Sequence, residues 1–376
     1  MSSQGPVPEH APGAAPGHRL RYDGRLGDLY RIFFLNLLLT VLTLGIWRFW
    51  ARTRLRRHVW QHLSLDGQRL EYTGTGGELF RGFLLALLVI VPLLFAMGLT
   101  QMLAPEAARL ASFALYLPAG LLGFAGAFTA RRYLLSRTLL NGVAFHLSGS
   151  PWRYGAGMLG RMFLSFLTLG LSLPWMAATS LRWTLGETSY GTARFTFTGR
   201  GGQLFPWYLL AALLAAILTF AAVAAFLLPP ILQNAALFQG GGRVDPAVQD
   251  ALGKRLMVLM LPVGGVFLLS LQLAGSLIQA AQWRLTVRST SLEELRFRSR
   301  RGTLRVALFL FGNALLVWLS LGLLWPLAQH RSLRFFADDL LLSGEMSLAR
   351  VRQAEGYRPG HGEGLADVLG AGASVF

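Results

Sequence analysis

The chain has 376 residues, of which 53% are hydrophobic and only 14% are charged, and its formal net charge is +17. Soluble globular domains are roughly a quarter charged, so this composition excludes an ordinary soluble protein and indicates an integral membrane protein. The lack of cysteine excludes disulfides and thiolate metal sites. The arginines lie in short blocks beside apolar runs, as in cytoplasmic loops of membrane proteins, so the charge does not indicate nucleic-acid binding.

An N-terminal stretch, residues 1–18, is rich in proline, glycine and alanine and is predicted to be a disordered tail without a cleaved signal peptide. Apolar runs follow along the rest of the chain, each close to the roughly 20 residues that a helix needs to cross a bilayer. These runs cover residues 29–47, 82–103, 111–130, 156–178, 206–229, 256–281 and 304–325. The simplest interpretation is seven membrane spans.

Three of the apolar runs contain a similar triplet, which closes with Gly45, Gly170 or Gly322. A polar residue precedes each glycine by the same number of residues in all three runs, and an arginine follows each glycine at another constant spacing along the sequence. The polar residues are Asn36, Arg161 and Asn313, and the arginines are Arg57, Arg182 and Arg334. This self-similarity predicts an internal repeat. The predicted units are 19–149, 150–302 and a partial third at 303–352, followed by a disordered tail at 353–376.

The polar stretches between the apolar runs have the pattern of β-hairpins. Residues 62–72 alternate apolar with polar side chains around Asp66-Gly67, and residues 139–145 do so around an Asn-Gly pair. Residues 194–198 and 284–288 alternate in the same way. Single strands cannot lie in lipid, because their backbone groups would stay unpaired. We therefore expect an α-helical polytopic membrane protein with internal repeats, whose short cytoplasmic β-hairpins between membrane segments pair into a small sheet.

The distribution of arginine conflicts with seven spans. The segments 52–79, 131–155, 179–205 and 282–305 are all arginine-rich, so all four look cytoplasmic. The first, fourth and seventh apolar runs would then begin and end on the same side. Re-entrant hairpins that turn at Gly45, Gly170 and Gly322 would resolve the conflict, because glycine tolerates the backbone angles of a tight turn. Seven spans, and four spans with three re-entrant hairpins, both remain open.

The segment after the first of these turns, residues 47–60, is predicted to be an interfacial helix. Trp47 and Trp50 are residue types that favour the headgroup level, and arginines beside them attract anionic lipid. These arginines are Arg52, Arg54, Arg56 and Arg57, with Arg182 and Arg334 at corresponding places in the later copies. The alternative is that the block only sets the orientation of the chain in the membrane.

The first copy carries a family resemblance. Residues 44–54, followed by Arg56-Arg57-His58, 65–67 and 71–74, resemble the YjgN-like family of bacterial inner-membrane proteins. The resemblance implies a multi-pass protein of the bacterial inner membrane. It supplies no mechanism, because the family is one of unknown molecular function. The later copies depart from the pattern, with different residues at 176–178 and 328–330 from those at 51–53.

Nothing in the sequence indicates an enzyme. The histidines are scattered without the spacing of a metal site, so we expect no catalytic residues, no metal and no cofactor. The glycine-rich segments 74–77 and 199–202 are not followed by lysine, unlike a phosphate loop, and are interpreted as turns that lead into membrane helices.

Two functions remain open. In the first, the protein is a transporter or channel for a small solute, with a pathway near Asn36, Arg161 and Asn313. In the second, it is a non-transporting scaffold that binds anionic lipid or a protein partner through its arginine-rich helices and hairpins. The three polar residues would then only form hydrogen bonds between helices. The sequence also leaves open whether the chain forms a homo-oligomer.

Overall fold

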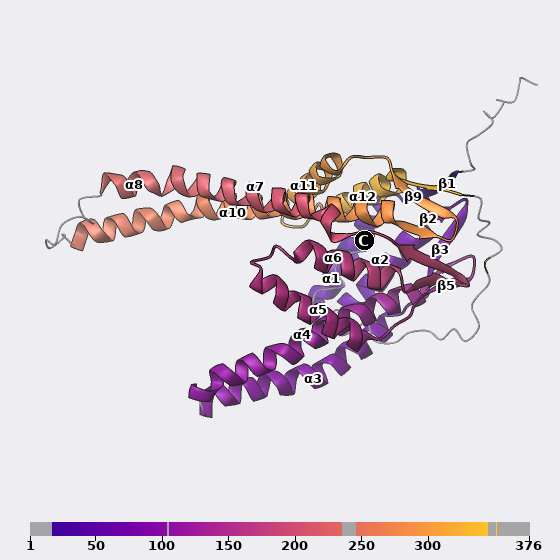
Figure 1. Cartoon of the computed structure of the whole chain (residues 1–376), viewed down its shortest axis with the longest axis horizontal. Coiled ribbons are helices and arrows are strands. Elements are labelled where there is room, and N and C mark those ends of the chain that lie inside the picture. Colours follow the sequence, from indigo (N-terminus) through magenta and orange to yellow (C-terminus); the bar gives the residue numbers. More distant parts are fainter. Residues whose placement is uncertain (1–16, 104, 235–245, 345–350, 352–376) are drawn as a thin grey trace, which may run out of the picture.

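The computed structural model describes residues 17–103, 105–234, 246–344 and 351. Figure 1 shows the strands gathered at one end of the molecule, with the helices projecting from that end in pairs.

In the described part of the chain, ten short strands form a closed antiparallel barrel in the order β1-β10-β9-β8-β7-β6-β5-β4-β3-β2. The strands are β1 (Gly17–Tyr22), β2 (Leu63–Leu65), β3 (Gln68–Tyr72), β4 (Thr138–Leu140), β5 (Val143–Leu147), β6 (Thr188–Tyr190), β7 (Ala193–Phe197), β8 (Thr290–Leu292), β9 (Leu295–Ser299) and β10 (Leu340–Ser343). Strands that are neighbours in sequence are neighbours in the barrel, and β1 pairs with β10 to close it. Closure removes every free sheet edge.

Two-residue turns join β2 to β3, β4 to β5, β6 to β7 and β8 to β9 at one rim, which we call the turn rim. In the first turn φ is +51° at Asp66 and +81° at Gly67, and in the second it is +53° at Asn141 and +73° at Gly142. Positive φ at both positions is the type I′ geometry, whose twist matches that of the flanking strands.

Every other connection is a helical hairpin. Because neighbouring strands are antiparallel, these hairpins all leave the opposite rim, which we call the helix rim. Three are short: α1 (Leu26–Leu42) with α2 (Arg48–Gln61), α5 (Pro151–Leu167) with α6 (Leu173–Leu185), and α11 (Thr303–Leu319) with α12 (Trp325–Asp339). Two are long: α3 (Gly76–Leu103) with α4 (Pro105–Ser136), and α7 (Gly201–Phe226) and α8 (Leu228–Gln233) with α10 (Pro246–Ser289).

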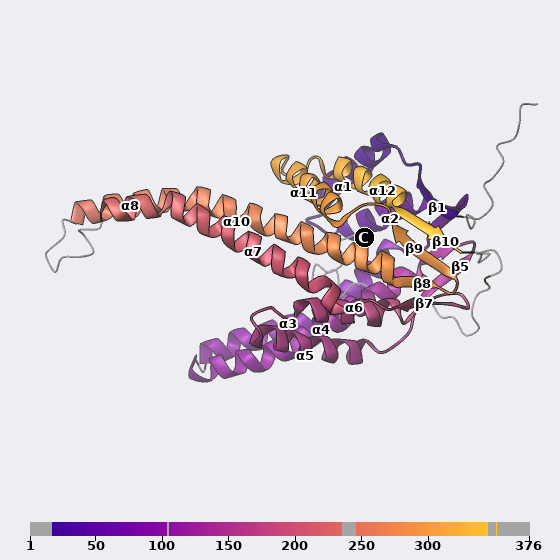
Figure 2. The same cartoon turned by 45° about the horizontal axis from the view of Figure 1, so that its top comes forward.

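Short and long hairpins alternate along the chain, and consecutive helices pack on one another, with α10 packing on α7. The ring of helices closes where α12 meets α1, at a stacked contact between Phe33 and Trp325 with ring centroids 6.0 Å apart. Figure 2 shows the two long hairpins diverging away from the barrel, with the short ones at its base.

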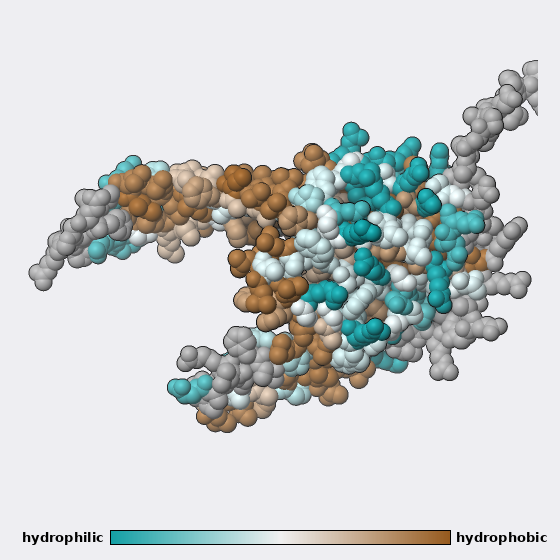
Figure 3. All heavy atoms as spheres, in the orientation of Figure 1, coloured by the Kyte–Doolittle hydropathy of each residue, from teal (hydrophilic) through white to brown (hydrophobic). Residues whose placement is uncertain are grey.

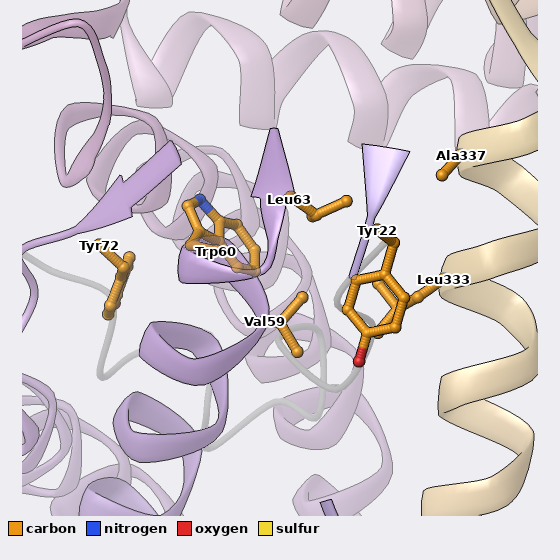
Figure 4. Close-up of a cluster of buried hydrophobic side chains, with 7 residues drawn as sticks. All are labelled: Tyr22, Val59, Trp60, Leu63, Tyr72, Leu333 and Ala337. Atoms are coloured by element: carbon orange, nitrogen blue, oxygen red, sulfur yellow. The ribbon is translucent and has the colours of Figure 1, made fainter. Parts of the chain in front are cut away.

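The barrel is filled by its own side chains. Phe145, Phe195 and Phe297 lie in a row across strands, with ring centroids 6.4 Å and 6.3 Å apart. They belong to an apolar cluster with Leu140, Tyr190, Leu292 and Leu295. A second cluster lies at the helix rim and joins strands β1 to β3 to the helices α2 and α12 (Figure 4). It comprises Tyr22, Val59, Trp60, Leu63, Tyr72, Leu333 and Ala337.

The predicted fold class is wrong in one major respect, because the strands form a closed ten-stranded barrel and not a small sheet of separate hairpins. The pairing of Gly17 with Ser343 and of His18 with Leu342 joins the two ends of the described chain. Such a long-range pairing has no local sequence signal. The predicted strand at 284–288 is also wrong: these residues continue α10, and Leu285 packs against Phe197 from its helix.

Three helical segments are long and apolar enough to cross a membrane, within the part of the chain that the structure describes. They are Gly76–Leu103, Gly201–Gln233 and Ala247–Ser289. The apolar runs at 29–47, 156–178 and 304–325 do not fold as single helices. In each, one helix ends shortly before Gly45, Gly170 or Gly322 and a second begins shortly after it, with Pro174 and Pro326 in the first turn of the second helix.

Candidate membrane surface and its polar sites

The tips of the three short hairpins share one backbone geometry. Leu44, Leu169 and Leu321 have φ of +49°, +49° and +50°, and the glycines that follow have φ of +92°, +87° and +90°. The amide of Gly45 donates to the Thr40 carbonyl (2.7 Å), and Gly170 and Gly322 make the corresponding bonds at 2.6 Å and 2.8 Å. Each tip leucine is 94% exposed. An apolar side chain this exposed to water is unfavourable, so the tips fit an apolar surrounding.

The helices expose many large apolar side chains, whereas a soluble monomer rarely exposes an apolar patch of more than a few hundred Å². Figure 3 shows hydrophobic residues over the projecting helices and hydrophilic ones over the barrel. On the long hairpins, Phe95 is 71% exposed, Phe220 74% and Leu261 75%. In the three candidate spans only 6 to 11% of the most apolar window is buried. The helices therefore have the surface of segments surrounded by lipid.

Asn36 and Asn313 each tie together the two helices of their own hairpin. The Asn36 Oδ1 accepts from Trp47 Nε1 at 3.1 Å, and its Nδ2 donates to the Ala51 carbonyl at 3.5 Å. The Asn313 Nδ2 donates to the Ala328 carbonyl at 3.3 Å and to Ser332 Oγ at 3.0 Å. Both side chains are buried. The two amide side chains thus form hydrogen bonds between the helices of their own hairpins.

Arg161, the third member of this set, behaves differently. Its Nη1 donates to the Gly157 carbonyl of its own helix at 2.9 Å, and its guanidinium lies 5.2 Å from the centre of the Trp183 ring. Helix α5 packs on α4 and α6, whereas α11 packs on α10 and α12. The structure therefore does not bring Arg161 and Asn313 together, and the described residues show no shared polar pathway.

The arginine block of α2 divides between two faces of the helix. Arg54 and Arg57 line a cavity of about 460 Å³ between α2 and the start of α3. Arg52 and Arg56 line a second cavity, of about 330 Å³, beside Asn36 and Trp325 at the contact between α1 and α12. Arg56 is buried, and it donates to the Tyr72 hydroxyl at 3.3 Å.

The predicted second copy places its arginine at a point that matches the first. Arg57 Nη2 donates to the Gly74 carbonyl at 3.4 Å, and Arg182 Nη2 donates to the Gly199 carbonyl at 3.0 Å. Arg334 lies near Tyr22, where its charge opposes the effect of burial. Burial still dominates and raises the pKa of Tyr22 to about 12.

Two glycine joints connect a short hairpin to the next long one, and sequence reasoning missed their partners. A Cβ on Gly76 would lie 2.7 Å from the Trp50 ring and 2.9 Å from its Cα, and a Cβ on Gly201 would lie 2.6 Å from the Cα of Trp175. Glycine is needed here because a tryptophan of the preceding helix packs directly on the backbone. The predicted repeat contained a signal, since Trp50 and Trp175 occupy corresponding positions in its first two copies.

No group of three or more histidine or acidic side chains lies together as a metal site within the described ranges. The described histidines instead lie among aromatic and basic residues, as His58 does beside His62, with ring centroids 4.3 Å apart.

The comparisons with known proteins identify a family. A family model described as "Bacterial protein of unknown function (DUF898)" matches residues 17–368. No curated protein and no solved structure matches the chain. The resemblance to the YjgN-like family is confirmed, because that family is a DUF898 family. The match includes all the described strands and helices, and the chain belongs to this bacterial family of unknown function.

Proposed function

We propose that the protein is a non-transporting membrane scaffold, which holds a basic β-barrel at the cytoplasmic face of the bacterial inner membrane and binds anionic lipid through its arginine-rich helices. One observation carries the proposal: all five helical hairpins of the described chain leave the same rim of a closed barrel. The barrel then lies wholly on one side of the bilayer, with every hairpin inserted from that side.

Helix length separates the hairpins into two roles. At 1.5 Å per residue, the 28 residues of α3 extend about 42 Å, which exceeds the roughly 30 Å of a hydrocarbon core. The 17 residues of α1 extend about 25 Å, and the chain then returns to the barrel. The long hairpins can therefore cross the bilayer twice, whereas the short ones enter it and leave on the same side.

Charge supports a cytoplasmic barrel. Arginines that are exposed on the outward face of the strands include Arg21, Arg69, Arg194 and Arg298. The described far end of the α7 and α10 hairpin carries few charges: Lys254 Nζ lies 2.6 Å from Asp250 Oδ2, and Arg255 donates to Gln233. Cytoplasmic segments of membrane proteins carry the excess of arginine and lysine, so the barrel belongs inside.

The packing supports a scaffold over a transporter. The barrel interior is filled by aromatic and aliphatic side chains, and the polar residues of the short hairpins form hydrogen bonds within their own hairpins. A transport pathway needs polar groups that converge on one site.

The topology can be tested because the chain has no native cysteine. Single cysteines would replace Gln68, Thr192 and Glu294 at the turn rim, and Gln101 and Asn234 at the far ends of the long hairpins. An impermeant thiol reagent added to intact cells should label only the two far-end positions, and should label the turn rim after permeabilisation. Labelling of Thr192 but not of Gln68 in intact cells would contradict a barrel on one side.

A further inference from the structure

The cavity of about 460 Å³ beside α2 has the composition of an anion site. Its α2 wall is one stripe of the helix at successive turns, and the other walls come from Ile32 of α1 and from the start of α3. The stripe consists of Trp50, Thr53, Arg54, Arg57, His58 and Gln61. The volume lies within the range of about 300–1,000 Å³ that is typical of small-molecule sites.

The positive charges at this cavity are not neutralised by its lining, which includes no Asp or Glu among the described residues. The guanidinium of Arg54 lies 5.5 Å from the centre of the Trp47 ring. Arg57 donates from Nη2 to the Gly74 carbonyl, and its other N–H groups remain available for a ligand. Two carboxylates lie nearby. Glu78 is directed away from α2, where it pairs with Arg137 at 2.5 Å and accepts from the Tyr133 hydroxyl. Asp28 of α1 is exposed and lies close enough to His58 to act on it electrostatically, but it does not line the cavity.

The start of α3 adds backbone donors. The Thr75 hydroxyl accepts from the Glu78 amide at 3.3 Å, whereas the amides of Gly76 and Gly77 belong to the first turn, whose N–H groups have no acceptor within the helix. Gly77 lines the cavity, and a Cβ placed on it would meet nothing within 4 Å, so the space beside this residue is open. The positive end of the helix dipole and two guanidinium groups thus border the same space.

The second repeat does not reproduce this site. Its tip glycine lies 125 residues after the first (170 − 45 = 125), so Thr179 stands in place of Arg54 and Trp183 in place of His58. The third copy retains Arg331 in place of Arg54, but its counterpart of Gly77 lies outside the described residues. The first repeat therefore combines features that the described parts of the others lack.

We infer that this cavity binds the phosphate group of an anionic phospholipid. Arg54 and Arg57 contribute charged hydrogen bonds, the amides of Gly76 and Gly77 contribute backbone donors, and the Trp50 ring covers the apolar side. The inference rests on the proposed function, which places α2 at the bilayer surface, and it assigns to the first repeat a specific headgroup site.

The test uses the purified full-length chain in neutral detergent and isothermal titration calorimetry. Four probes are compared: dihexanoyl phosphatidylglycerol, dihexanoyl phosphatidylcholine, glycerol phosphate and inorganic phosphate. We expect saturable one-to-one binding of the anionic lipid, with weaker or undetectable binding of the other three. Equal binding of inorganic phosphate would assign the cavity to a free phosphate ion and would overturn the lipid assignment.

Matched variants separate the site from general electrostatics. Arg54→Gln should weaken lipid binding about tenfold, as expected for loss of one charged hydrogen bond. Arg331→Gln removes the same charge from a similar setting, 5.6 Å from the Phe309 ring, and should change binding less than twofold. Gly77→Leu should fill the cavity and abolish binding, whereas Gly202→Leu, at an equally open glycine of the second repeat, should not.

Equal weakening by Arg54→Gln and Arg331→Gln would show binding by net charge alone and would overturn the inference. The inference would also be overturned if the Gly77→Leu variant, with an unchanged unfolding temperature, still bound the lipid saturably. The cysteine-labelling experiment is independent of these titrations. The titrations can therefore disprove the lipid site without affecting the one-sided topology. A wrong topology would appear in the labelling experiment, as turn-rim cysteines that are labelled in intact cells.

Discussion

The short and the long helical hairpins start from the same rim but are stabilised differently. Each short hairpin turns through a left-handed leucine and glycine pair, and buried amides such as Asn36 and Asn313 cross between the helices of two of them. The hairpin of α7 and α10 instead packs small side chains such as Ala211, Ala274 and Ala280. Specific geometry is thus concentrated in the short hairpins, whereas the long hairpin of α7 and α10 relies chiefly on length, apolarity and small residues at its contact.

The largest effect is expected at the joint between the two kinds of hairpin. Gly76→Ala would place a Cβ 2.9 Å from the Trp50 Cα and should destabilise the protein by about 2–3 kcal/mol, the cost of overpacking a tight contact. Gly77→Ala, at the adjacent open position, is the control and should change stability by less than about 0.5 kcal/mol. Both would be measured by thermal unfolding in detergent. Similar unfolding temperatures for the two variants would show that the joint is not tight.

The next effect concerns the amides of the short hairpins. Asn36→Leu and Asn313→Leu should each destabilise by about 1–2 kcal/mol, because an interhelical hydrogen bond in a membrane is worth about 0.6 kcal/mol on average and two are lost at each site. Thr219→Val is the control in a long hairpin, since the Thr219 hydroxyl contacts Ser270 Oγ at 3.3 Å. It should have a smaller effect. Loss of an assayable transport activity with unchanged stability in the asparagine variants would favour a transporter over a scaffold.

A smaller effect is expected at the tips. Gly45→Ala would force a side chain to adopt φ of +92° and should cost about 1 kcal/mol. Gly160→Ala lies in a regular helix with nothing within 4 Å of its Cβ position, and should be neutral or stabilising. Unfolding temperatures of the two variants, measured side by side, provide the test. A neutral Gly45→Ala would mean that the tip accepts another backbone conformation.

The smallest effect should appear as a dependence on pH at the base of a short hairpin. Burial, together with the charge of Arg132, lowers the pKa of His146 below its ordinary value of 6.5. The unfolded chain therefore takes up a proton before the folded one, so stability should be highest above about pH 6.5 and fall as the pH falls below it. His146→Gln should flatten this slope in unfolding curves recorded between pH 5 and 8. An unchanged slope would assign the dependence to other groups, such as His58, whose pKa is also lowered by burial.

Local signals predicted the parts of the fold that local geometry determines. The Asp66-Gly67 and Asn141-Gly142 pairs mark two tight turns, because few other residues accept positive φ at both positions. Gly45, Gly170 and Gly322 lie at the three tips because glycine readily adopts the φ of about +90° found there. Residues 284–288 were assigned wrongly, since alternation over five residues does not distinguish a strand from the end of a long helix that packs on one side.

Closure of the barrel and the candidate lipid site could not be predicted in the same way. Closure depends on β1 and β10, which lie at opposite ends of the described chain and carry no turn signal between them. The candidate site depends on which side of α2 faces α3. The spacing of Arg54, Arg57 and His58 shows that they share a stripe, but only the packing of Gly76 on Trp50 places that stripe beside the start of α3.

The described chain has an odd number of helical hairpins, and this makes their ring asymmetric. Five units that alternate between short and long cannot close without placing two of one kind together, and here the two short hairpins of α1 with α2 and of α11 with α12 become neighbours. Around the ring, the two pairs of long helices are separated by a single short hairpin on one side and by two on the other. In the topology proposed above, the molecule is therefore asymmetric within the plane of the membrane, with one broad sector that holds only short hairpins.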